Sequence, residues 1–329
     1  MALKNSNSDL ENYKIIERIS RLSGRRLSSL ELIAVVYDLK PAMAEMVNFR
    51  EFNESFIKKL DKINKLCKKL SLHFVVSKYK FIINSPRGIF KMVDLDSPQK
   101  GKIAMGISKD KERALRGVDL YYEKIFSSQK GREFGQVMGY PECCLDFGDY
   151  LCNDNDDPNN FGFKNPAVES LKRSEDFAWQ LNVFSYSLLS YYPCSLTCAP
   201  SISSVNKIIS FLEIADPKRA EMTVNNLKEP ASLYWTCVDK ILLYGDFKGD
   251  FRNSEIKYNR LVSELDSENF YQSNDLHFLN NLKRVQEKVQ QGNKLIMAPD
   301  YFEIYKDKRR IAKIKKENQY EPVLIKPNR

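Results

Sequence analysis

The sequence is poor in histidine, with only His73 and His277 among its 329 residues. Neither lies in a motif of metal ligands or catalytic partners, so a histidine-based zinc site or a Ser-His-Asp triad is not expected. Phosphate-binding loops of the G-x-x-x-x-G-K-[ST] and G-x-G-x-x-G types are also missing, which leaves ATP or NAD use without support. The chemistry of this chain must therefore depend on other side chains.

The sequence also lacks long apolar runs. No window approaches the roughly 18 consecutive apolar residues that predict a membrane-spanning helix. Residues Met1 to Ser8 show neither the apolar stretch nor the cleavage pattern of a secretory signal. We therefore expect a cytoplasmic protein without a membrane association. In a reducing compartment its seven cysteines should be thiols or metal ligands and not disulfides.

The apolar content, at 43%, is sufficient for a real core. Periodic apolar positions predict helices, and short runs rich in branched residues predict strands between them. The fold class we expect is α+β, rich in helices, with a small sheet. The helices that matter below are predicted at 30–46 with a kink at Pro41, at 167–190 and at 254–266.

The composition changes along the chain and predicts three parts. Residues 1–8 look like a disordered tail, and residues 9–245 form the main α+β domain, which carries all seven cysteines. Gly245 to Gly249 is typical of a linker. Residues 250–329 form a more polar, basic C-terminal subdomain or extension.

Four of the cysteines form two pairs, each beside prolines. The first pair lies in Gly139-Tyr140-Pro141-Glu142-Cys143-Cys144, and the second in Pro193-Cys194-Ser195-Leu196-Thr197-Cys198-Ala199-Pro200. Proline is favoured at the first position of a helix, so Pro141 and Pro200 predict that helices begin at the cysteines. Free N–H groups and the helix dipole favour thiolates there. We therefore predict a four-cysteine metal site between helix N-termini.

The metal is less clear than the ligands. Thiolates select Zn²⁺, Fe–S clusters or Cu(I). The spacing of Cys194 and Cys198 fits a zinc site, but the adjacent Cys143 and Cys144 fit it poorly. We therefore favour an Fe–S cluster with an open iron and keep zinc as the alternative. Ordinary buried cysteines and a redox dithiol are two further interpretations, and the dithiol lacks the usual C-x-x-C spacing.

These segments carry a resemblance to an uncharacterised prokaryotic family of domains of unknown function. Its signature reads G-R-x-x-G-Y-P-x-C-C, followed some fifty residues later by P-C-x-x-x-C. The chain is similar to it over about residues 30 to 250, although Arg132 lies further upstream than the pattern places its arginine. The resemblance implies the same cysteine set but no particular reaction.

Residues beside the cysteines are candidates for further roles. Cys143, Glu142 and Asp146 are candidate catalytic groups, because a free thiolate or a carboxylate near a metal can act as nucleophile or as general acid and base. Tyr140 and Tyr192 are candidates to line a cofactor or substrate pocket. A solvated carboxylate and a packing aromatic are the alternative interpretations.

Two functions follow from these observations. The first is a thiolate-metal enzyme that acts on a small-molecule or carrier-bound substrate. The second is a zinc-stabilised binding module for nucleic acid or an acidic protein, since the chain carries a formal charge of +9 and a basic run at Lys306 to Lys316. The first is favoured, because the vicinal Cys143 and Cys144 are unusual for a purely structural site.

Overall fold

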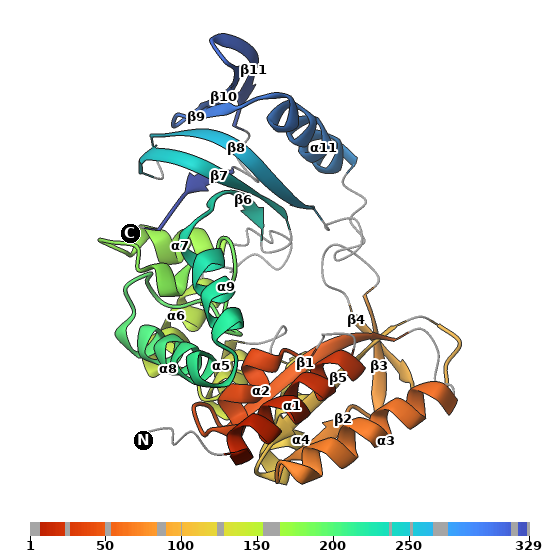
Figure 1. Cartoon of the computed structure of the whole chain (residues 1–329). Coiled ribbons are helices and arrows are strands. Elements are labelled where there is room, and N and C mark those ends of the chain that lie inside the picture. Colours follow the sequence, from red (N-terminus) through yellow and green to blue (C-terminus); the bar gives the residue numbers. More distant parts are fainter. Residues whose placement is uncertain are drawn as a thin grey trace.

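The computed structural model has two antiparallel sheets at opposite ends of the molecule, with a group of helices between them (Figure 1). It describes residues 7–23, 27–49, 54–83, 90–99, 101–123, 128–153, 165–236, 239–250, 253–265, 276–316 and 322–327. The fold is therefore mixed α+β, as predicted, but it has a five-stranded and a seven-stranded sheet where the sequence predicted a single small sheet. Of the predicted tail, residues 1–6 lie outside the described residues, and Asn7 and Ser8 already belong to the first helix.

The N-terminal sheet has the strand order β1-β5-β3-β4, and β2 pairs with β5 off that path, along Met105 to Ser108. Its strands are β1 (Ala42–Phe49), β2 (His73–Val76), β3 (Tyr79–Ile83), β4 (Phe90–Asp94) and β5 (Gly101–Ser108). The helices of this half are α1 (Asn7–Leu22), α2 (Ser29–Val36), α3 (Glu54–Lys69) and α4 (Lys111–Glu123).

The middle of the chain is helical and carries both cysteine pairs. Its helices are α5 (Ser128–Met138), α6 (Glu142–Asn153), α7 (Pro166–Lys172), the 3-10 turn η1 (Trp179–Leu181), α8 (Ala199–Ala215) and α9 (Pro217–Lys228). The largest hydrophobic core extends from α1 and α2 into this group and includes Cys144 and Cys198. The cysteine site is thus part of the main core.

The C-terminal sheet has the order β11-β10-β9-β8-β7-β6-β12, with every pairing antiparallel. Its elements are β6 (Ala231–Thr236), β7 (Asp239–Gly249), β8 (Ser254–Leu265), α11 (Leu276–Gln291), β9 (Lys294–Met297), β10 (Tyr301–Lys306), β11 (Arg309–Lys315) and β12 (Val323–Ile325). A second core, to which α11 contributes Leu282, Val285 and Val289, lies on one face of this sheet.

Three predicted elements are wrong. The helix expected at 30–46 ends at Val36, because Ala42 to Phe49 instead forms a strand paired along its whole length with β5. The helix expected at 254–266 is strand β8. Of the helix expected at 167–190, only Pro166–Lys172 is α-helical, and the chain then runs through turns to η1.

The interpretation of Gly245 to Gly249 as a linker is also wrong. These residues form the end of β7, in register with β8 from Gly245 opposite Tyr258 to Gly249 opposite Ser254. The C-terminal sheet therefore contains strands from both sides of the predicted boundary. The division into a main domain and a C-terminal extension itself stays a prediction.

In the part of the chain that the structure describes, no helix combines the length and the apolar composition that crossing a membrane would require.

Candidate metal centre

The first cysteine pair is positioned by a tight connection between α5 and α6. Gly139 ends α5 with a positive φ of 77°, and a Cβ at this position would lie 2.3 Å from Cδ of Pro41. Only glycine tolerates both the backbone conformation and the close contact. Pro141 follows, and α6 begins at Glu142, so Cys143 and Cys144 lie in its first turn.

The second pair lies just before α8. Cys194 follows Pro193 in a turn, and Cys198 is the N-cap residue of α8, with Pro200 in the first turn of the helix. The backbone N–H of Cys198 donates to the carbonyl of Ser195 at 3.2 Å, which closes the turn between the two cysteines. Because Cys194 lies in the bend before α8 and not at a helix N-terminus, our prediction that the four cysteines lie between helix N-termini is wrong in this respect.

The four sulfurs converge. Among the described residues, Cys143, Cys144, Cys194 and Cys198 form a group whose ligand atoms all lie within 4.8 Å of one another. The Sγ atoms of Cys143, Cys144 and Cys198 are 3.7 to 4.0 Å apart. Cys144 and Cys198 are buried, Cys194 is intermediate and Cys143 is exposed. This tetrad is placed to hold a metal ion.

The thiols hold protons unequally. The pKa of Cys198 is lowered to about 4, first because the Cys144 thiol donates a hydrogen bond to it and further because Ser201 donates to it. The same hydrogen bond and burial raise the pKa of Cys144. Burial and the charge on Cys198 raise the pKa of Cys194 to about 12. Without a cation the site therefore favours a thiolate at Cys198 and protonated thiols at Cys144 and Cys194, and a bound cation would remove that restriction.

Ser201 and Tyr191 support the tetrad, and the sequence had not indicated this role for either residue. Ser201, in the first turn of α8, is fully buried, and its Oγ donates to Sγ of Cys198 at 3.2 Å. The same Oγ lies 3.0 Å from the hydroxyl of Tyr191 and 3.7 Å from Sγ of Cys144. Serine and tyrosine carry no signal for such a role when their spacing to the cysteines follows no motif.

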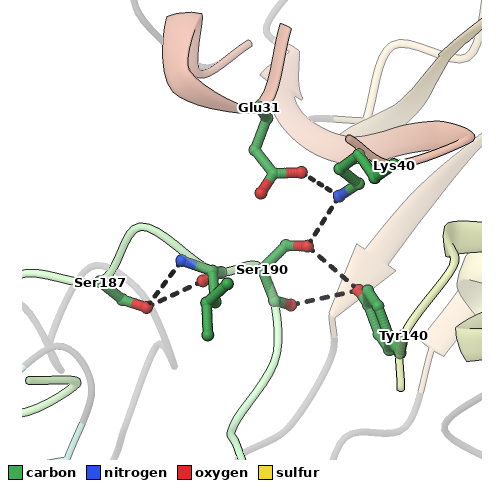
Figure 2. Close-up of polar contacts among 6 residues, drawn as sticks. Glu31, Lys40, Tyr140, Ser187 and Ser190 are labelled. Carbon is green, nitrogen blue, oxygen red and sulfur yellow. Dashed lines mark hydrogen bonds and ion pairs between the residues drawn. The ribbon is translucent and has the colours of Figure 1, made fainter. Parts of the chain in front are cut away.

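Tyr140 connects the site to the N-terminal half of the protein. Its ring lies 4.5 Å from that of Tyr191, and its hydroxyl donates to the carbonyl of Ser190 at 3.2 Å. Figure 2 shows that Ser190 also accepts from Lys40, at 3.0 Å, and that Lys40 forms an ion pair with the buried Glu31 of α2. Burial raises the pKa of the Tyr140 hydroxyl above its usual value, so this group is a neutral donor.

The two candidate carboxylates form ion pairs with an arginine. Glu142 and Asp146 both pair with Arg132 of α5, the latter at 2.9 Å, and Asp149 joins them at 2.5 Å. Neither belongs to the group of converging ligand atoms. In this structure they link α6 to α5, and a catalytic role for either stays a prediction.

Tyr192 is half-buried against the main core beside Cys194. Its role in holding a cofactor, like that of Tyr140, stays a prediction.

Comparison of the chain with models of known families, with curated proteins and with solved structures finds no match. The resemblance to the family with the paired-cysteine signature therefore remains an expectation from the sequence.

Proposed function

We propose that the four cysteines bind a single zinc ion that links the start of α6 to the turn before α8. The observation that carries this proposal is the spacing of the sulfurs. Four sulfurs around one zinc ion at about 2.3 Å form a tetrahedron with edges of about 3.8 Å. The three Sγ–Sγ distances among Cys143, Cys144 and Cys198, from 3.7 to 4.0 Å, match those edges.

The spacing favours one ion over the iron–sulfur cluster that the sequence had favoured. In a [4Fe–4S] cluster each cysteine binds a different iron, so the ligand sulfurs lie further apart than sulfurs that share one ion. All the ligand atoms here lie within 4.8 Å of one another. Cys143 and Cys144, although adjacent, both direct their sulfurs toward Cys198. Adjacent cysteines, which we expected to fit a zinc site poorly, can therefore both bind one ion here.

The surroundings suit a site of high negative charge. Zinc with four thiolates carries a net charge of −2, which needs nearby donors and positive dipole ends. Cys143 and Cys144 lie at the N-terminus of α6, and Cys198 lies at that of α8. Ser201 adds its hydroxyl and its backbone N–H to the sulfur of Cys198. A zinc site with four protein ligands and no open position is structural in type.

The test is metal analysis of protein prepared without oxygen, for the natural chain, Cys194→Ser and Cys67→Ala. Cys67 is buried in α3 and is not among the converging ligands, so it controls for loss of a thiol. We expect colourless protein with one zinc per chain, lost in Cys194→Ser and retained in Cys67→Ala. Brown protein with absorption near roughly 400 nm would contradict zinc and support the cluster.

One observation supports a second function, an enzyme that uses Cys143 on a small-molecule or carrier-bound substrate. Cys143 is the exposed member of the tetrad, so its sulfur can meet a reagent while the other three hold the ion. Alkylation of the metal-loaded protein with iodoacetamide, followed by mass spectrometry, tests this function. Selective reaction at Cys143 with the zinc retained would support it, and equal protection of all four cysteines would oppose it.

A further inference from the structure

The C-terminal sheet has two chemically different faces. Positions directly opposite one another across its strands share a face, because side chains alternate along each strand. One such row consists of apolar residues on successive strands from β7 to β11, namely Phe247, Ile256, Leu295, Ile304 and Ala312. These residues belong to or pack against the core to which α11 contributes. We call this the inner face.

The next row along the strands lies on the opposite side, which we call the outer face. Across the same five strands it consists of Asp246, Lys257, Lys294, Tyr305 and Arg310. Two positions further along, the outer face continues with Lys248, Glu255, Ile296, Glu303 and Lys313. The inner row is apolar, whereas these two rows of the outer face are mostly charged.

Basic side chains lie beside aromatic rings on the outer face. Arg260, opposite Tyr244, lies 3.6 Å from the centre of its ring, and Lys313 lies 3.8 Å from that of Tyr301. Lys294 lies 5.7 Å from the ring centre of Tyr305. The side chains of Arg310 and Lys313 are about half exposed, at 53% and 49%. The three rings are thus each covered by a cation at or near the surface.

The charges do not cancel. With Arg260 and Lys315 added, these two rows carry seven basic groups against the three carboxylates of Asp246, Glu255 and Glu303. Further along β7 and β8 on the same face, Lys240 and Glu264 form an ion pair that adds one charge of each sign. Ion pairs engage two of those carboxylates, because Glu255 pairs with Lys294, and Glu303 pairs with both Arg310 and Lys313. A pocket of ≈ 450 Å³ at the end of the β7–β8 hairpin, lined in part by Lys248, Lys257 and Lys326, adjoins these rows.

We propose that the outer face of the C-terminal sheet binds single-stranded nucleic acid. Cations placed beside aromatic rings on an open sheet match a ligand that alternates phosphates with flat bases, which stack on tyrosine rings or on guanidinium planes. The five strands from β7 to β11 span about 19 Å at roughly 4.8 Å per strand, enough for a few nucleotides. An acidic peptide would use the cations but would not need three rings. The proposal is independent of the metal centre.

The test is fluorescence anisotropy with a single-stranded oligo(dT) probe of about 15 nucleotides, a length within the site sizes of sheet-based binders. The full-length protein is titrated at salt concentrations from about 50 to about 200 mM. Arg260→Gln with Lys313→Gln removes two cations from the outer face. The matched control is Lys62→Gln with Lys65→Gln, which removes the same charge from exposed positions on α3. Zinc content and circular dichroism of every variant report separately on the metal centre and on folding.

We expect the natural chain to bind the probe with affinity that falls as salt rises. The outer-face double variant should lower the salt slope by about 1.4, for two phosphate contacts on a single strand, and the α3 control should leave it unchanged. Tyr301→Leu should weaken binding about tenfold through lost stacking, and Tyr301→Phe, which keeps the ring, should not.

Three results would overturn the proposal. They are the absence of binding to the probe at low salt, equal losses of affinity in the outer-face and α3 double variants, and equal affinity of Tyr301→Leu and Tyr301→Phe for the probe. Competition by polyglutamate as strong as that by unlabelled oligo(dT) would also contradict it and would point to an acidic protein partner instead.

Discussion

Replacing Ser201 with alanine should weaken metal binding although the residue is not a ligand. Its Oγ is fully buried and donates to Sγ of Cys198 at 3.2 Å. The substitution removes a hydrogen bond to a thiolate and leaves the Tyr191 hydroxyl, 3.0 Å away, without this partner. Hydrogen bonds to charged groups contribute about 1.5–3 kcal/mol. That range corresponds to about a 10- to 100-fold loss of affinity, the range typical for residues that support metal ligands.

The assay is competition for zinc against a chromophoric chelator at fixed pH, under a reducing atmosphere. Ser204→Ala is the matched control, because Ser204 lies on the same helix, is only half-buried, and donates to the carbonyl of Pro200 at 3.1 Å. We expect Ser201→Ala to release zinc to about 10- to 100-fold less chelator and Ser204→Ala to behave as the natural chain. If Ser201→Ala holds zinc as tightly as the natural chain, the role assigned to this hydroxyl is wrong.

Three further outcomes are expected. Lys40→Met leaves the buried Glu31 without its cation and should lower the free energy of unfolding in urea by about 3–5 kcal/mol. Adding Glu31→Gln should recover part of that loss, and equal stability of Lys40→Met and the natural chain would refute this prediction. Zinc binding at neutral pH should release protons from Cys144 and Cys194, whose pKa values are raised, so zinc affinity should rise with pH. Calorimetry in buffers of different ionisation enthalpy measures the release, and a buffer-independent heat would contradict it. Arg132→Gln should lower the melting temperature by separating α5 from α6, most clearly at low salt, while the zinc content stays the same; loss of zinc would show instead that Arg132 supports the site.

The cysteine site could be anticipated because its signals are local. Pro141 and Pro200 indicate where helices begin, and α6 and α8 do begin beside them. The role of Ser201 could not be anticipated, because a serine within a helix is ordinary. Its hydrogen bond to Cys198 depends on the rotamer of the serine side chain, which the sequence does not indicate. Nor could the sequence indicate the spacing of the sulfurs, on which the choice between one ion and a cluster depends.

The errors in the fold have physical causes in particular segments. Ala42 to Phe49 contains good helix formers, but full pairing with the buried strand β5 outweighs that propensity. In β8 the register shifts beside Arg260, where Tyr244 lies opposite Arg260 and Gly245 opposite Tyr258. The bulge leaves Asn259 unpaired and moves the apolar positions from even to odd numbers, so that the spacing imitates a helix. Long-range pairing of this kind has no signature within a single segment.

The central claim is that one ion is shared by four cysteine sulfurs. X-ray absorption at the zinc edge of the full-length, metal-loaded protein tests it most directly. The proposal predicts a single shell of four sulfur atoms at about 2.3 Å from zinc. A mixed shell containing nitrogen or oxygen ligands would contradict it, and so would iron in the protein as prepared, with a second iron as a scatterer in a spectrum recorded at the iron edge.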